Sequence, residues 1–103
     1  MTSIQGNITP ILTPFFRRGF DEQSFLVLGD NILNHTDGLF VLGKTGEFEF
    51  LPLKLKKHIV DLTAKYFRLA PKAIVVGVTC QTLEETAELA AYTFQKPGID
   101  ALV

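Results

Sequence analysis

The sequence predicts an α/β fold built on a parallel sheet, because strand-like apolar runs alternate with segments of helical periodicity along the chain. Two runs carry most of this prediction. Leu39–Leu42 and Ala73–Gly77 are continuous and apolar, as in strands that are buried on both faces. The intervening segments repeat apolar residues at helical spacing. The predicted order is β-α-β-α-β-α-β, with short connections and no strand that looks like an exposed antiparallel edge.

The first strand and the first helix are predicted between Ile8 and Asn34. The β-branched and apolar stretch Ile8 to Phe15 is predicted to form a short strand that ends at Pro14, because proline removes a donor from the hydrogen-bond ladder. A turn at Arg17–Gly19 follows. Asp21 is placed to cap a helix that ends near Asn34. The apolar stripe of this helix consists of Phe25, Leu28, Ile32 and Leu33.

The second strand begins after Gly38, and the second helix follows Pro52. Gly43 closes the strand at its carboxyl end. The expected apolar stripe of the helix consists of Leu53, Leu55, Ile59, Leu62, Ala64, Tyr66 and Phe67. A polar cluster at the start of the helix, which we expect to form a solvated face, consists of Lys54, Lys56, Lys57 and His58.

The third helix has a recognisable start and stop. Thr82 and Glu85 form the T-x-x-E pattern of a capping box, which contributes on the order of 1 kcal/mol to a helix. The helix is predicted to run to about Gln95 and to stop at Pro97-Gly98. A fourth strand then begins at Ile99 and continues to Val103.

Composition excludes several classes of function. The 103 residues are 47% hydrophobic, which argues against disorder, and they carry a net charge of −1 with no basic block. We therefore expect no nucleic-acid or membrane partner, and a cytoplasmic protein. The single cysteine, Cys80, excludes an internal disulfide and is expected to be a small, partly buried side chain. His35 and His58 have no second ligand at metal spacing, so neither a metal nor a cofactor is implied.

The second predicted strand overlaps a phosphate-loop pattern. Gly38 to Thr45 satisfies G-x-x-x-x-G-K-[ST], the written form of a nucleotide-binding loop. The residues between the two glycines would then have to leave the sheet and curl around phosphate. Their continuous apolar character indicates a strand instead, and Gly46 with Pro52 discourages a helix directly at Lys44. A nucleotide-binding module is therefore only a remote alternative.

The spacing of the units predicts part of a barrel. At about 30 residues per β-α unit, eight units need about 250 residues, the usual size of a (β/α)₈ TIM barrel. Residues 1–103 supply less than half of that length. We expect them to form the N-terminal portion of a single TIM-barrel domain, truncated inside the fourth strand.

Three stretches of the sequence resemble the dihydrodipicolinate synthase and N-acetylneuraminate lyase superfamily, which includes 2-keto-3-deoxygluconate aldolases. They are Gly6-x-Ile8-Thr9-Pro10-x-x-Thr13-Pro14-Phe15, Asp37 to Glu47, and Gly77 with Thr82-x-Glu84. The resemblance covers nearly the whole chain. It implies a (β/α)₈ barrel, usually tetrameric, that binds pyruvate or another 2-keto acid as a Schiff base on a lysine. The reaction implied makes or breaks a carbon–carbon bond with an aldehyde.

The resemblance also assigns roles to the turn Gly43-Lys44-Thr45-Gly46-Glu47. In the family this turn grips the keto-acid carboxylate, so Thr45 is expected to bind substrate there. Glu47 is expected to pin the turn. Lys44 stands where the family has a Ser or Thr that relays protons, and an ammonium cannot accept and pass a proton as a hydroxyl does. Lys44 is therefore expected to attract an acidic substrate or to pair with Glu47, with depressed-pKa carbonyl chemistry as a further alternative.

Two functions from different classes remain open. The first is a fragment of a Schiff-base (class I) aldolase, whose catalytic lysine and tyrosine the resemblance places beyond Val103. The second is a non-catalytic barrel relative used for binding or assembly, suggested by Lys44.

Overall fold

A computed structural model of the chain describes residues 6–16, 19–43, 51–67 and 72–103. Four strands within these ranges pair in parallel, in the order β1-β4-β5-β6. They are β1 (Ile8–Pro10), β4 (Gly38–Val41), β5 (Ala73–Val76) and β6 (Ala101–Leu102). The helices between them are α1 (Glu22–His35), α2 (Leu53–Phe67) and α3 (Leu83–Phe94). The alternation predicted from the sequence is confirmed.

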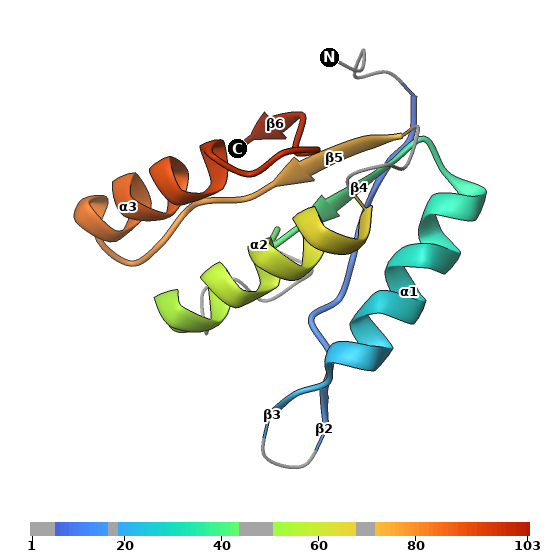
Figure 1. The fold of residues 1–103 in the computed structure, drawn as a ribbon, viewed down its shortest axis with the longest axis horizontal. Helices are drawn as coiled ribbons and strands as arrows, with labels where there is room; N and C mark the ends of the chain where they lie inside the picture. The colour runs from blue at the N-terminus through green and yellow to red at the C-terminus, as the bar shows by residue number, and fades with distance from the viewer. Residues whose placement is uncertain (1–5, 17–18, 44–50, 68–71) are drawn as a thin grey trace.

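The three helices cover one face of the sheet, and they follow one another across it in chain order (Figure 1). Side chains alternate between the faces of a strand, so Leu39 and Val41 of β4 share a face with Ile74 and Val76 of β5. All four belong to one buried cluster to which every helix contributes. The helical members of this cluster are Phe25, Leu33, Ile59, Val60, Phe67 and Leu89. Crossovers of a single hand explain this arrangement, because a right-handed β-α-β unit repeated in one direction places each helix on the same side.

The opposite face of the sheet carries the intervening residues. Phe40 of β4 lies beside Val75 of β5, and Val75 lies beside Ala101 of β6. In a closed barrel this face points to the interior, which side chains fill in layers.

A hairpin that the sequence analysis did not predict lies between β1 and α1. Its strands, β2 (Phe15–Phe16) and β3 (Gly19–Phe20), are antiparallel, and the hairpin projects beyond the start of α1 (Figure 1). The ring of Phe20 lies 6.3 Å from that of Phe15 and 5.5 Å from that of buried Phe25. This aromatic contact stabilises the hairpin against α1.

Some predicted boundaries were wrong by a few residues. The first strand ends at Pro10 instead of reaching Pro14, although the Ile11 N–H still donates to the Phe40 carbonyl at 3.1 Å. The fourth strand covers only Ala101–Leu102 of the predicted Ile99–Val103, whereas the first helix ends at His35, close to Asn34 as predicted. Tyr66, which was assigned to an apolar stripe, is 55% exposed.

Both predicted helix caps are confirmed. The Asp21 carboxylate accepts from the Ser24 N–H at 3.1 Å and from the Ser24 hydroxyl at 2.6 Å, and these bonds lower the pKa of Asp21. The Thr82 hydroxyl accepts from the Glu85 N–H at 3.1 Å. Each cap satisfies a donor in a first helical turn, which would otherwise lack an intrahelical partner.

Two aspartates, each just before a strand, make the same pair of hydrogen bonds to the neighbouring strand or the residue just before it. The Asp37 N–H donates to the Asn7 carbonyl at 3.0 Å, and its carboxylate accepts from the Asn7 N–H at 2.8 Å. The Asp100 N–H donates to the Ile74 carbonyl at 2.8 Å, and its carboxylate accepts from the Ile74 N–H at 2.9 Å. Each aspartate precedes a strand and closes a pair of bonds to the neighbouring strand. We call these pairs the aspartate clamps.

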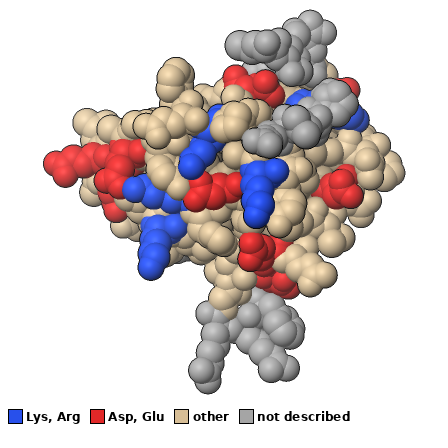
Figure 2. Space-filling model, viewed as in Figure 1, with Lys and Arg blue, Asp and Glu red and all other residues tan. Residues whose placement is uncertain are grey.

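Charge is distributed without a dominant sign. Acidic and basic side chains are interspersed on the face shown in Figure 2. None of the helices in the described part of the chain is long and apolar enough to cross a membrane.

Candidate functional site

The carboxyl ends of β4 and β5 form the edge at which the sequence analysis placed the functional turn. Beyond β4 the chain passes through Leu42 and Gly43, both buried. Leu42 has a φ of 61°, a left-handed conformation that costs a leucine about 1–2 kcal/mol. The structure therefore contradicts the expectation that Leu42 lies extended, and the strand ends at Val41. Backbone strain of this kind is often found at functional sites.

The predicted substrate-binding residues come next in the sequence. Lys44 and Thr45, together with Glu47, fall in the range 44–50, outside the residues that the structure describes. Their roles therefore stay predictions. The strand that leads to them does argue against the phosphate-loop interpretation, because Leu39 and Phe40 are paired with both β1 and β5, and Val41 is paired with β5.

Two glycines allow the backbone to approach closely at this edge. A Cβ on Gly77 would lie 2.5 Å from the Leu42 carbonyl oxygen, so only glycine fits there without movement. The Gly77 N–H donates to the Val41 carbonyl at 2.8 Å, which continues the ladder beyond β5. A Cβ on Gly43 would lie 3.1 Å from the ring of Phe40. The backbone at Leu42-Gly43, the backbone at Gly77 and the ring of Phe40 therefore meet where β4 ends.

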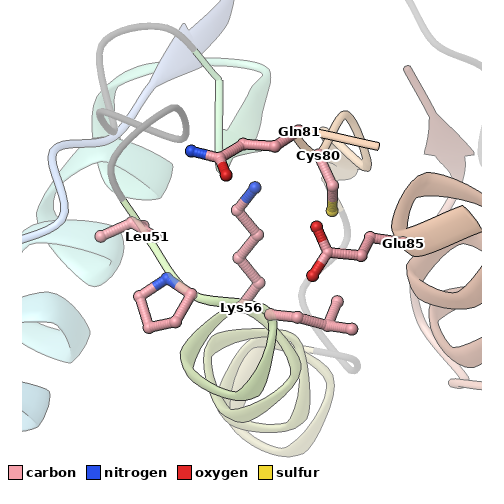
Figure 3. A pocket seen from close by; sticks show the side chains of 7 residues that line it. Leu51, Lys56, Cys80, Gln81 and Glu85 are labelled. Carbon is pink, nitrogen blue, oxygen red and sulfur yellow. The ribbon is translucent and has the colours of Figure 1, made fainter. Parts of the chain in front are cut away.

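A cavity of about 390 Å³ lies beside this edge, between the first turns of α2 and α3. It is lined by Leu51, Pro52, Leu53, Lys56, Cys80, Gln81 and Glu85. In Figure 3 the Lys56 side chain points from α2 toward Gln81, and the Glu85 carboxylate points into the same space from α3. The cavity thus presents an ammonium and a carboxylate from different helices.

Lys56 is the main residue that the sequence analysis misplaced. It was expected on a solvated face, yet it is only 2% exposed. Its Nζ donates to the Thr79 carbonyl at 3.0 Å, which joins α2 to the loop after β5. Lys54 and His58 are exposed as expected, and Lys57 is half-buried. Helical periodicity alone cannot reveal this burial, because the acceptor lies 23 residues away in sequence.

A second polar cluster joins α2 to the end of α3. The Tyr92 hydroxyl donates to the Asp61 carboxylate at 2.6 Å, and Lys96 Nζ lies 2.9 Å from the same carboxylate. Lys96 Nζ also lies 4.4 Å from the centre of the Tyr92 ring. Lys57 pairs with Glu88 nearby. We call Asp61, Tyr92 and Lys96 the α2–α3 clasp.

The clasp shifts the pKa of each of its members. Partial burial raises the pKa of Asp61, but the hydrogen bonds from Tyr92 and Lys96 and the Lys96 charge outweigh it, so the net pKa is lowered. The bond to Asp61 raises the pKa of Tyr92 and also that of Lys96. These shifts come from a helix–helix contact, away from the carboxyl edge of the sheet.

Cys80 is partly buried as predicted, and the two histidines lie against other parts of the protein. Cys80 is partly buried, and its thiol lies 3.6 Å from the Val78 carbonyl. His58 lies against the ring of Phe20, and His35 Nδ1 lies 2.9 Å from the Asn31 carbonyl on its own helix. Within the described ranges, no three His, Cys, Asp or Glu side chains gather in a way that could hold a metal ion.

Comparisons with known proteins agree with this geometry. The sequence pattern of the Dihydrodipicolinate synthetase family matches residues 3–103. A 4-hydroxy-tetrahydrodipicolinate synthase of Brucella abortus is 30% identical over 97% of this chain and 34% of its own length. The chain therefore spans about a third of the length of such relatives.

Solved structures that share the fold include two whose sequence identity to this chain exceeds a quarter. YagE of E. coli K12, a dihydrodipicolinic acid synthase family protein solved in complex with pyruvate, has a TM-score of 0.84 and 29% identity, covering 92% of this chain and 32% of its own. KD(P)GA of T. tenax has a TM-score of 0.83 and 26% identity, covering 95% and 33%. The parallel sheet and its helices correspond to the first part of a TIM barrel in these neighbours. The chain belongs to the dihydrodipicolinate synthetase family.

Proposed function

We propose that this chain is part of a Schiff-base-forming aldolase or lyase that makes or cleaves a carbon–carbon bond between a 2-keto acid and an aldehyde. The observation that carries the proposal is the family match over residues 3–103. Two relatives support the chemistry: the YagE structure holds pyruvate, and the Brucella abortus protein is a synthase of 4-hydroxy-tetrahydrodipicolinate. Pyruvate is therefore the keto acid that we propose as substrate.

The proposed site lies where β4 ends. Loops at the carboxyl ends of barrel strands face the active site, and backbone N–H groups beside glycines can hold a carboxylate. Thr45 binds the keto-acid carboxylate in this proposal, and Lys44 adds a positive charge beside it. The course of the chain supports this placement, because β4 ends at Val41 and buried Leu42 and Gly43 follow it at the carboxyl edge of the sheet.

The wider setting is part of the same proposal. Residues 1–103 form the N-terminal portion of one barrel domain, in a cytoplasmic protein that assembles as a homo-oligomer. Pyruvate and an aldehyde are its small-molecule partners. The Schiff base forms on a lysine that the family resemblance places beyond Val103.

Borohydride reduction in the presence of pyruvate tests the proposal. The protein to use is the natural gene product that carries this sequence, here called the natural protein. We expect mass spectrometry to find one reduced pyruvyl adduct on a lysine, because borohydride converts a Schiff base to a stable secondary amine. Omitting either pyruvate or borohydride is the control. If saturating pyruvate gave no adduct, the enzyme proposal would fail and the non-catalytic relative would be favoured.

That second function rests on a specific residue. Lys44 replaces the hydroxyl side chain of the family's proton relay, and losing a positioned acid–base group typically costs about 10²- to 10⁴-fold in rate. A barrel with this change binds keto acid with little turnover. Protection from thermal unfolding by pyruvate without adduct formation would identify such a binding protein.

A further inference from the structure

Phe40 occupies a place in the sheet that the roles given above do not use. Its two neighbours on β4, Leu39 and Val41, are fully buried in the core beneath the helices, whereas Phe40 points to the opposite face and is only partly buried. In a barrel this is the interior face, and Phe40 is close to its carboxyl end. Its aromatic ring therefore lies inside the barrel, near the rim where β4 ends.

The ring of Phe40 lies close to the backbone of two glycines. A Cβ added to Gly43 would lie 3.1, 3.2 and 3.3 Å from three atoms of this ring. A Cβ added to Gly77 would lie 3.5 Å from it. The ring thus lies against both glycines at the ends of neighbouring strands. A side chain on Gly43 would displace it.

The strained residue Leu42 lies between Phe40 and Gly43 in sequence. Its backbone has a left-handed φ of 61°, and its side chain belongs to the buried core cluster. The position of Gly43 is therefore constrained twice: Leu42, the preceding residue, is anchored in the core, and the ring of Phe40 lies against Gly43. Strain of this kind persists only when surrounding packing over-determines the conformation.

We propose that Phe40 is a positioning residue for the binding of 2-keto acid, acting through the backbone of Gly43. This inference rests on the proposed function. A ring in contact with Gly43 fixes where the chain leaves β4, and a backbone site for a carboxylate depends on such placement within a fraction of an ångström. Removing the ring leaves an apolar void beneath Gly43, into which the backbone relaxes.

The consequence for binding differs from that for stability. Truncating Phe40 lowers affinity for pyruvate, while the chemistry on the lysine continues once pyruvate is bound. Val75 offers a matched control, because it is the direct neighbour of Phe40 on β5, it faces the same side, and it is buried. Val75→Ala also removes interior volume, but Val75 is not among the atoms nearest to Gly43.

Borohydride trapping of the natural protein over a range of pyruvate concentrations tests this inference. For Phe40→Ala we expect the half-saturating concentration to rise about tenfold, with the extent of trapping at saturation preserved. Phe40→Leu, which refills much of the void, should restore most of the affinity and remains measurable if the alanine variant does not fold. Val75→Ala should bind pyruvate as the unaltered protein does. Thermal unfolding of all three variants reports their stability separately.

The outcomes separate the two proposals. If the unaltered protein forms no adduct, the proposed function fails and this inference falls with it. If the unaltered protein forms the adduct and Phe40→Ala and Phe40→Leu saturate at the same pyruvate concentration, only the role of Phe40 is overturned. An equal loss of affinity in Val75→Ala also overturns it, because the effect would then come from interior volume in general.

Discussion

Gly77 lies directly beneath the carbonyl oxygen of Leu42, which would be 2.5 Å from a Cβ at position 77. This contact joins the ends of β4 and β5 where the left-handed residue turns the chain. Any side chain at position 77 must push the Leu42 peptide away. The close approach of the two strand ends therefore requires glycine at position 77.

Gly77→Ala is expected to destabilise the natural protein by about 1–3 kcal/mol, the usual cost of overpacking. Urea unfolding followed by circular dichroism measures the loss. Gly19→Ala is the control, because a Cβ there meets nothing within 4 Å. An unchanged midpoint for Gly77→Ala would show that the Leu42 peptide moves freely.

The aspartate clamp at Asp100 makes a prediction about side-chain chemistry. Asp100→Ala removes an acceptor for the Ile74 N–H and is expected to cost about 1–3 kcal/mol of unfolding free energy. Asp100→Asn keeps an oxygen acceptor and should cost less. Urea unfolding of both variants beside Asp30→Ala, a change at an exposed position of α1, gives the comparison. Equal losses for the alanine and asparagine variants would contradict the clamp.

The α2–α3 clasp predicts how stability depends on pH. The folded pKa of Asp61 lies below its ordinary value of 3.8, so its contribution is complete above that value and is lost as the pH falls through the folded pKa. The raised pKa values of Tyr92 and Lys96 make their contributions complete below 10.0 and 10.5, and lost as the pH rises further. The clasp therefore has its full effect between these limits.

Asp61→Asn tests this dependence. The Asp61 side chain is 45% exposed, so screening by water limits the expected loss at neutral pH to about 0.5–1 kcal/mol. The difference from the unaltered protein should stay constant from mildly acidic to mildly alkaline pH and narrow below 3.8. Urea midpoints across a pH series measure it. A difference that grew toward acid would reverse the sign and contradict the assignment.

Lys56 is expected to matter more for stability than its neighbour on the same helix. Lys56→Met removes a buried ammonium that donates to the Thr79 carbonyl, at a cost of about 2 kcal/mol. Lys57→Met, at a half-buried position, should cost less than half of that. Thermal unfolding of the two variants compares them directly, and equal melting temperatures would argue against a structural role for the Lys56 bond.

Lys44→Thr makes a prediction about activity. Restoring a hydroxyl at this position should raise the rate of proton transfer by about 10²- to 10⁴-fold, if the family relay operates in the natural protein. Exchange of the pyruvate methyl protons with deuterium, followed by NMR, measures proton transfer without an aldehyde. Lys54→Thr, on an exposed part of α2, is the control. A slower exchange in Lys44→Thr would show that the lysine itself takes part.

The elements that the sequence predicted are those with strong local signals. Buried strands such as Leu39–Val41 follow from continuous apolar runs, and the caps at Asp21 and Thr82 follow from residue type and position. The hairpin was missed, because two-residue strands are too short to show alternation. Its stability comes from ring contacts with Phe25 in the following helix.

The features of the candidate site depended on contacts across the sequence. Nothing local to Lys56 reports that its acceptor is Thr79, and nothing local to Leu42 reports a left-handed conformation. The aspartate clamps did leave a signal, since Asp37-Gly-Leu and Asp100-Ala-Leu repeat the same arrangement before a strand. Gly77, like Lys56 and Leu42, left no local signal: the need for a glycine there comes from the Leu42 carbonyl oxygen, which belongs to another strand end.

The two aspartate clamps sit at the amino edge of the sheet, opposite the edge at which β4 and β5 deliver their loops. Because these bonds fix the strand register at the amino edge, the register does not depend on the residues at the carboxyl edge. Loops at that rim can then vary in sequence while the strands keep their alignment. In a protein held in this way, sequence changes in the rim loops leave the pairing of the strands intact.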